Sequence, residues 1–170
     1  MNYRIIGALL VVLSSSAVGF SIAASQRKEA NALMQLIRGL EFMSCELEYR
    51  LTALPELCRL TAMQVTGPVR DLFDDLEREL TMQISADAGC CMEAVLHKAD
   101  KLPQSVKNEL RLLGKSLGRF DLQGQLSGIA SVMELCRRDL EGLLCNQDVR
   151  LRSYRTLGIC AGVALVILFI

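Results

Sequence analysis

The chain contains 170 residues, and its 19 basic side chains balance its 19 acidic ones. This balance, with one histidine and no tryptophan, gives no basic footprint for a phosphate backbone, so no nucleic-acid partner is expected. Hydrophobic residues make up 51% of the sequence, with long apolar runs at both ends. The roughly 130 residues between those ends are enough for one domain with a modest core.

The first element is an apolar segment, 5–24, without a charged residue. As a helix rising about 1.5 Å per residue, it covers the roughly 30 Å hydrocarbon layer of a bilayer, so we predict a transmembrane helix within residues 1–25. A cleaved secretory signal is the alternative, because Ser21 and Ala23 offer small residues at a plausible cleavage site, although Arg27 and Lys28 behind them would resist translocation. Small residues that favour close helix packing recur at every fourth position, at Ser15, Gly19 and Ala23.

The middle of the chain, 26–155, is predicted to be an all-α bundle of about six helices, because its apolar residues recur three and four positions apart. The first and last of these helices are expected to extend into the membrane-spanning segments. The apolar stripe of the first helix is Leu33, Ile37, Leu40, Met43, Leu47, Leu51 and Leu54. Proline at a first helical turn then predicts two shorter helices, 55–65 and 68–82.

Three further helices are expected. Ser85 is expected to cap the first of them, with Asp87 in its first turn. Pro103 is expected to open the second, which Gly118 ends, and Asp121 is expected to cap the third. The apolar faces of the first two are Cys91, Val95 and Leu96, and then Val106, Leu110, Leu113 and Leu117. The last has a seam for antiparallel neighbours, formed by Leu122, Leu126, Ile129, Met133, Cys136, Leu140 and Leu143.

The chain ends in a second charge-free segment, 156–170, which we predict to be a C-terminal transmembrane segment. About fifteen residues span a bilayer only with local thinning or help from a partner, so an interfacial position is the alternative. Gly158 and Gly162 form a GxxxG pair within it. This pair, or the small-residue stripe of the first segment, could mark contacts between copies of the chain.

Positive charge on the inner flanks of both segments predicts that the middle of the chain faces the cytoplasm, with both termini across the membrane. These inner-flank residues are Arg27, Lys28, Arg150, Arg152 and Arg155, against Arg4 alone on the outer side. Seven cysteines, an odd number, also suit a compartment where thiols stay reduced.

Three groups of residues invite a catalytic interpretation, and each fails on spacing. Residues 114–116, Gly-Lys-Ser, resemble the end of a phosphate-binding loop, but Glu109 occupies the earlier glycine position and the segment follows no strand. Cys90, Cys91 and His97 have no fourth zinc ligand at a suitable spacing. Carboxylates surround a helix without converging, at Asp71, Asp74, Asp75, Glu77 and Glu79. We therefore expect no enzyme, no bound metal and no cofactor.

Two short motifs carry a resemblance that covers essentially the whole chain. Residues 113–121, LGKSLGRFD, followed by Gln125, resemble the LG-three-LG-two-D turn of the stage III sporulation protein AB family. This resemblance implies that Gly114, Gly118 and Asp121 form a structural turn. Residues 52–56, TALPE, resemble the Thr-Pro-Leu-Pro-Glu turn of that family and depart from it at Ala53. Its C-terminal signature is matched by Arg152, Tyr154, Leu157 and Gly158, and Gly7 lies in a matching first membrane segment.

That family is similar to the cytoplasmic domains of the type II secretion and type IV pilus platform protein F. The resemblance implies a subunit in the mother-cell membrane, within the channel complex between mother cell and forespore. There it would couple a cytoplasmic ATPase, stage III sporulation protein AA, to ring-forming proteins between the two membranes. The alternative is a membrane-anchored sensory bundle, but neither an extracytoplasmic sensing region nor a pocket with convergent polar groups is visible in the sequence.

Two charged helix faces are candidate docking surfaces for the ATPase. The first is an acidic face comprising Asp71, Asp74, Asp75 and Glu79. The second is a basic strip comprising Lys107, Arg111, Lys115 and Arg119.

Overall fold

The protein is an all-α bundle of six helices, as the sequence predicts. The computed structural model describes the backbone of residues 2–82, 87–118 and 121–169, and the side chains of residues 24–82, 87–118 and 121–145. The helices are α1 (Asn2–Arg50), α2 (Leu54–Gln64), α3 (Pro68–Thr81), α4 (Ala88–Lys98), α5 (Gln104–Ser116) and α6 (Leu122–Phe169).

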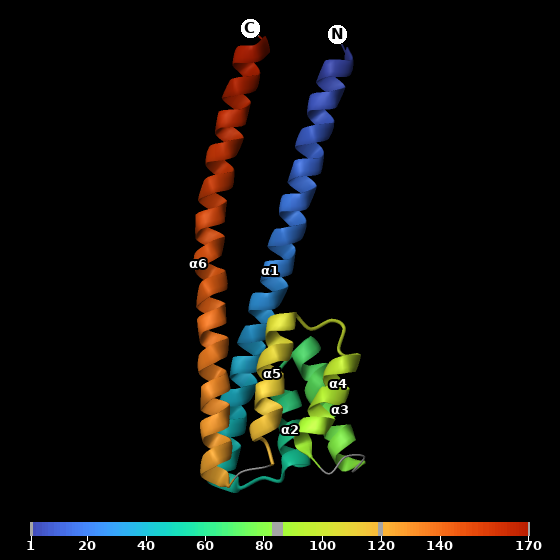
Figure 1. The fold of residues 1–170 in the computed structure, drawn as a ribbon, viewed down its shortest axis with the longest axis vertical. Coiled ribbons are helices and arrows are strands. Elements are labelled where there is room, and N and C mark those ends of the chain that lie inside the picture. Colours follow the sequence, from blue (N-terminus) through green and yellow to red (C-terminus); the bar gives the residue numbers. More distant parts are fainter. Residues whose placement is uncertain (1, 83–86, 119–120, 170) are drawn as a thin grey trace.

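The two long helices, α1 and α6, run side by side, and the four short helices pack beside one half of their length (Figure 1). At about 1.5 Å per residue, each long helix is about 70 Å long. The N-terminal end of α1 and the C-terminal end of α6 lie together at one end of the molecule. At the opposite end, which we call the tip, α1 passes into α2 and α5 passes into α6.

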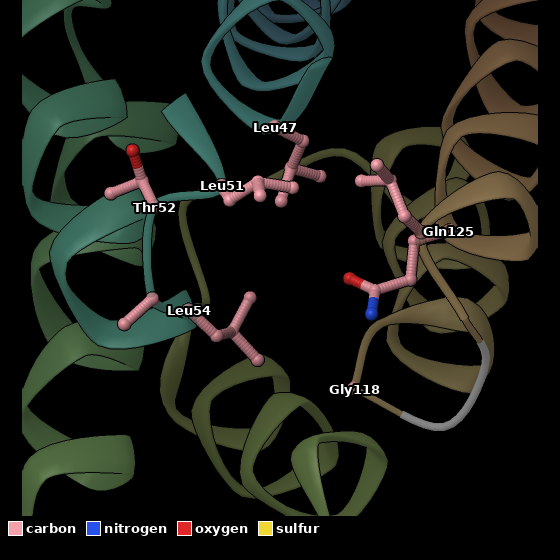
Figure 2. A pocket seen from close by; sticks show the side chains of 8 residues that line it. Leu47, Leu51, Thr52, Leu54, Gly118 and Gln125 are labelled. Carbon is pink, nitrogen blue, oxygen red and sulfur yellow. The ribbon is translucent and has the colours of Figure 1, made fainter. Parts of the chain in front are cut away.

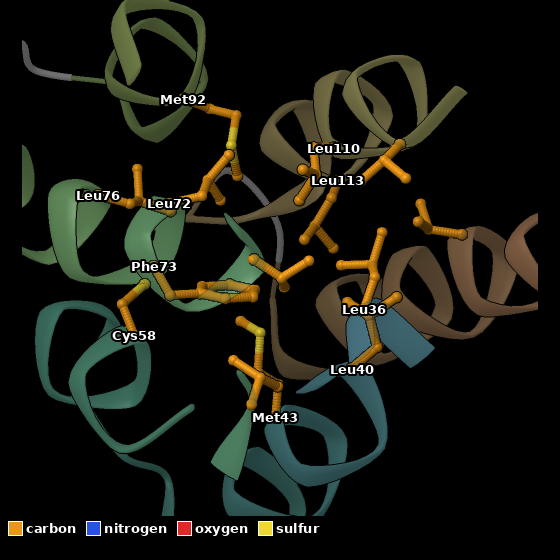
Figure 3. Packing of buried hydrophobic residues seen from close by; sticks show 14 of the residues in the cluster. Leu36, Leu40, Met43, Cys58, Leu72, Phe73, Leu76, Met92, Leu110 and Leu113 are labelled. Atoms are coloured by element: carbon orange, nitrogen blue, oxygen red, sulfur yellow. The ribbon is translucent and has the colours of Figure 1, made fainter. Parts of the chain in front are cut away.

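One continuous apolar core joins all six helices. Phe73 of α3 lies near its centre, close to Met43 of α1 and Leu72 of α3 (Figure 3). Burial of each such side chain contributes about 1.5–3 kcal/mol, so the core is the main source of stability of the bundle. The largest fully buried side chains are Phe73, Leu33, Leu36, Leu40, Met43, Leu57, Leu72, Leu76, Met92, Leu96, Leu110 and Leu113.

The first helix ends earlier than its apolar stripe predicts. Leu33, Leu40, Met43 and Leu47 are buried along α1, but the helix stops at Arg50. The next residue, Leu51, has φ +52°, in the left-handed region that does not continue a right-handed helix. The predicted stripe to residue 54 is therefore wrong at its end, because residues 51–53 turn the chain and Leu54 already belongs to α2.

The predicted starts of the later helices agree with the structure except at α4. Proline lies in the first turn of both α2 and α3, as predicted. Ser85 was expected to cap α4, but the N-cap is Asp87, whose side chain accepts a hydrogen bond from the Gly89 N–H. The prediction of Ser85 as the N-cap is therefore wrong. Asp87 lies two residues closer to the helix and provides the same kind of side-chain acceptor.

The predicted membrane segments, 1–25 and 156–170, lie almost entirely outside the residues whose side chains the structure describes. Within the described part of the chain, no helix combines the length and the apolar composition that crossing a bilayer requires. Ser15, Gly19, Ala23, Gly158 and Gly162, the proposed small-residue packing positions, also lie outside that part, and their packing stays a prediction.

Candidate functional site

The predicted acidic face on α3 is a mixed-charge surface. Asp71 is exposed, but the side chain of Glu79 is only 16% exposed because it contacts α4. There it raises the pKa of Lys98 by a hydrogen bond and by its charge. Three of the four carboxylates lie in ion pairs, Asp74 with Arg70 at 3.6 Å, Asp75 with Arg78 at 3.4 Å and Glu79 with Lys98 at 2.7 Å. These cations offset most of the negative field that the sequence alone suggests.

The predicted basic strip on α5 is not one exposed surface. Lys107 is only 8% exposed, whereas Lys115 is exposed, because eight residues of helix rotate about 80° beyond two full turns. Between them, the Arg111 Nε donates to Glu93 Oε2 of α4 at 3.1 Å. Arg119 lies outside the described residues. The cations of this strip that are both described and accessible are therefore Arg111 and Lys115.

The turn between α5 and α6 has the geometry that the sequence predicts at two of its three residues. Gly118 has φ +73°, a conformation that glycine adopts at little cost. Asp121 Oδ1 accepts a hydrogen bond from the Gly124 N–H at 3.0 Å, which caps α6. Gly114 does not belong to the turn, since it lies inside α5.

Close helix packing explains Gly114 and identifies a second small residue that sequence reasoning missed. A Cβ at Gly114 would lie 2.9 Å from Met92 Cβ of α4. A Cβ at Gly128 of α6 would lie 2.4 Å from Ser116 Cβ of α5. Both separations are too short for a real side chain, so α5 lies unusually close to α4 and to α6. A glycine within the helical seam of α6 was the available signal for Gly128.

A pocket of about 290 Å³ opens at the tip, between the α1–α2 connection and the start of α6. Figure 2 shows Leu51 and Leu54 on one side and Gln125 on the other, with the Gln125 amide pointing toward the pocket. The two sequence motifs of the resemblance, 52–56 and 113–121, both contribute to this pocket. Its lining is Leu47, Leu51, Thr52, Ala53, Leu54, Gly118, Leu122 and Gln125. No local sequence pattern predicts the pocket, because its two sides are more than sixty residues apart in the chain.

Several titratable groups are buried at helix contacts within the bundle. Burial raises the pKa of the Cys58 thiol to about 12, and burial also raises that of Cys136 to about 12. Thiols with such pKa values stay protonated at neutral pH and are poor nucleophiles. Glu109 is 9% exposed, and burial together with the Asp139 charge raises the pKa of its carboxyl group.

The residues that invited a catalytic interpretation are arranged as helix surface and core. Residues 114–116 lie in α5, where the Ser116 hydroxyl donates to the Leu113 carbonyl at 2.9 Å. Cys91 is buried, while Cys90 and His97 are exposed on α4. Among the described residues, no three histidine, cysteine, aspartate or glutamate side chains come together in a way that could hold a metal ion. The described surface carries a pocket at the tip and charged side chains on α3 and α5.

Comparisons with known proteins agree with this helical architecture. Residues 4–170 match the family model of stage III sporulation protein AB. The chain is 25% identical over 171 residues to the stage III sporulation protein AB of Bacillus subtilis (strain 168), covering 97% of this chain and 98% of that protein. A solved structure of stage III sporulation protein AB has the same fold, with a TM-score of 0.65 and 23% identity over 72% of this chain and 98% of that one. Because the family model spans nearly the whole chain, the protein belongs to the stage III sporulation protein AB family.

Proposed function

We propose that this chain is a noncatalytic platform subunit of the sporulation channel complex between mother cell and forespore. In this role it couples a cytoplasmic ATPase, stage III sporulation protein AA, to membrane and intermembrane ring components. Membership of the stage III sporulation protein AB family is the observation that carries the proposal. The likeness of that family to secretion platform proteins supplies the mechanical role.

The proposed membrane arrangement has three parts. Residues 1–25 and 156–170 are embedded in the mother-cell membrane, and residues 26–155 form the cytoplasmic bundle. The inner-flank arginines and lysines support this orientation, because positive charge is retained on the cytoplasmic side. Small residues in both membrane segments are proposed to pack against each other or against further copies of the chain.

The continuity of α1 and α6 supports a mechanical role for the bundle. Each helix runs without a break from the packed bundle toward its end of the chain, over 49 and 48 residues respectively. A displacement applied to the bundle would pass along such helices, whereas a flexible glycine and serine linker would absorb it. Direct continuity between bundle and membrane segments therefore suits a subunit that transmits ATPase movement.

Binding of the ATPase to the full-length chain in lipid nanodiscs tests the proposal. We expect measurable affinity for the stage III sporulation protein AA of the same bacterium. No affinity under any salt condition would remove the main support for the coupling role.

Charge-reversal variants in the same assay test the two docking faces. Asp71, Asp74 and Asp75 are reversed together on the acidic face, and Arg111 and Lys115 together on the basic strip. Exposed ion pairs add little to folding, so both variants are expected to keep the bundle intact and to report on binding. If neither variant changes the affinity, both faces are excluded as ATPase contacts.

A further inference from the structure

The tip exposes large apolar side chains around its pocket. Leu51 is 68% exposed and Leu122 is 37% exposed, and both line the pocket. Tyr49, on the last turn of α1, is also exposed. Exposed leucines at the edge of a pocket are typical of a surface that another molecule covers.

The backbone at the tip is held in a conformation that leucine does not favour. Leu51 has φ +52°, where the side chain of an L-residue crowds its own backbone. Glycine or asparagine would end α1 at this position with less strain. Because Leu51 is exposed, burial of its side chain within the chain does little to offset this strain. Strained positions of this kind concentrate where proteins bind ligands or partners.

The pocket has walls on both sides that are fixed by the fold. Glu46 Oε2 accepts a hydrogen bond from the Thr52 hydroxyl at 3.2 Å, and Glu46 also pairs with Arg50 at 3.6 Å. On the other side, Gly118 lies beside Leu54 of α2, because a Cβ placed on Gly118 would lie 3.7 Å from Leu54 Cδ2. A preformed pocket loses little freedom when it is filled. Its volume of about 290 Å³ exceeds the 150 Å³ or so that holds a benzene ring, so it admits one large apolar side chain or two small ones.

Negative charge borders this apolar pocket. Glu48 follows Leu47 on the last turn of α1, and Asp121 directly precedes Leu122. Both carboxylates are exposed, and neither forms an ion pair with another described residue. Two further carboxylates on α1 and α2 are paired, Glu46 with Arg50 and Glu56 with Arg59. These exposed carboxylates therefore favour a partner that carries positive charge beside its apolar group.

We propose that the tip pocket receives a large apolar side chain of a partner protein, presented on a segment with adjacent lysine or arginine residues. This inference rests on the proposed function in one respect, since the partner tested is the ATPase. It differs from the charged faces on α3 and α5 in its lining, because the pocket is formed by the end of α1, the α1–α2 connection, Gly118 and the start of α6. It also differs in chemistry, because the contact is centred on apolar burial.

The first experiment measures the affinity of the full-length chain in nanodiscs for the ATPase. Leu51→Asn and Leu122→Gln replace the exposed leucines, and asparagine tolerates the left-handed conformation at residue 51. Leu112→Gln, at an exposed leucine of α5 that does not line the pocket, is the matched control. Each tip variant is expected to weaken binding about tenfold or more, as loss of a buried apolar anchor does, and the control to leave it unchanged.

The second experiment tests the charge of the rim. Glu48→Gln combined with Asp121→Asn removes both carboxylate charges, and asparagine keeps the α6 cap. This variant is expected to bind more weakly at low salt, and the difference from the unmodified chain is expected to shrink as salt is added. Equal salt dependence of the two chains would contradict the cationic partner segment.

The outcomes separate this inference from the proposed function. Absence of ATPase binding by the unmodified chain overturns both. Normal ATPase binding by the tip variants, with their thermal unfolding unchanged, overturns the tip inference alone. If the tip variants instead reduce self-association, measured by mass photometry at constant ATPase affinity, the occupant is a second copy of the chain and the inference is also wrong.

Discussion

Among single residues, Glu109 stands out because its burial opposes folding at neutral pH. Its Oε2 atom is buried and has no hydrogen-bond partner among the described residues. Burial, and then the charge of Asp139 on α6, raises the pKa of the Glu109 carboxyl group. The folded chain therefore holds this proton more tightly than the unfolded chain. Its contribution to stability is favourable at low pH and is lost as the pH rises above the unfolded value.

Glu109→Gln is expected to raise the melting temperature of the full-length chain at pH 7, because glutamine removes the buried charge. The gain is expected to shrink toward pH 4, where the glutamate of the unmodified chain takes up a proton. Thermal unfolding at the two pH values measures it, with Glu134→Gln at an exposed residue of α6 as the control. A gain of the same size at both pH values would show that the charge of Glu109 is not the cause.

Sequence reasoning identified residues whose role is set by near neighbours in the chain. Asp121 and Gly118 were predicted because a cap and a left-handed turn depend on a few adjacent residues. Glu109 was missed as a buried group because it precedes Leu110 at the edge of the apolar stripe, where exposure depends on the packing of neighbouring helices. Leu51 was missed because leucine is rare at positive φ, so no residue type signalled the turn.

Among the helices, α5 depends most on close packing. Gly89 and Gly114 bring it close to α4, and Ser116 and Gly128 bring it close to α6. These contacts fix the position of the turn that follows α5, and therefore the position of one wall of the tip pocket. Close packing of small residues thus connects the core of the bundle to its candidate docking surface.

Gly128→Ala is expected to lower the free energy of unfolding by about 1–3 kcal/mol, although alanine has the better helix propensity, because its Cβ would lie 2.4 Å from Ser116 Cβ. The double variant Gly128→Ala with Ser116→Gly removes the clash and is expected to regain part of the loss. Denaturant unfolding of the four chains gives the coupling energy. Additive effects of the two substitutions would mean that α5 and α6 are farther apart than described.

Asp121→Ala is expected to cost about 1 kcal/mol, because the Gly124 N–H at the start of α6 loses its acceptor. Asp121→Asn keeps an acceptor and is expected to change stability little. Gly118→Val places a branched residue at φ +73° and is expected to cost more than either. Equal melting temperatures for Asp121→Ala, Gly118→Val and the unmodified chain would place the turn elsewhere.

Helix number and approximate bounds were predictable from periodicity and from proline and glycine positions. The predicted helix 55–65 begins and ends one residue later than α2, and the predicted helix 68–82 ends one residue later than α3. The orientation of charged faces was less predictable. Lys107, Arg111 and Lys115 are spaced four apart, yet rotation along the helix buries the first and exposes the last.

At the scale of the whole molecule, a small bundle is joined to two helices that leave it at the same end (Figure 1). This arrangement places the tip as far as the bundle allows from the predicted membrane segments. A cytoplasmic partner would therefore meet the tip without approaching the bilayer. The family was predictable because its motifs are local, whereas the tip pocket was not, because segments 47–54 and 118–125 meet only in the folded chain.

The central claim is that the bundle faces the cytoplasm at the end of membrane-embedded helices, and single-cysteine labelling in intact cells tests it most directly. All seven cysteines are replaced, and one cysteine is introduced either at Asn108, which is exposed on α5, or at Asn2. We predict that a membrane-impermeant maleimide labels Asn2→Cys in intact cells and labels Asn108→Cys only after permeabilisation. Labelling of Asn108→Cys in intact cells would place the bundle on the other side of the membrane and contradict the account.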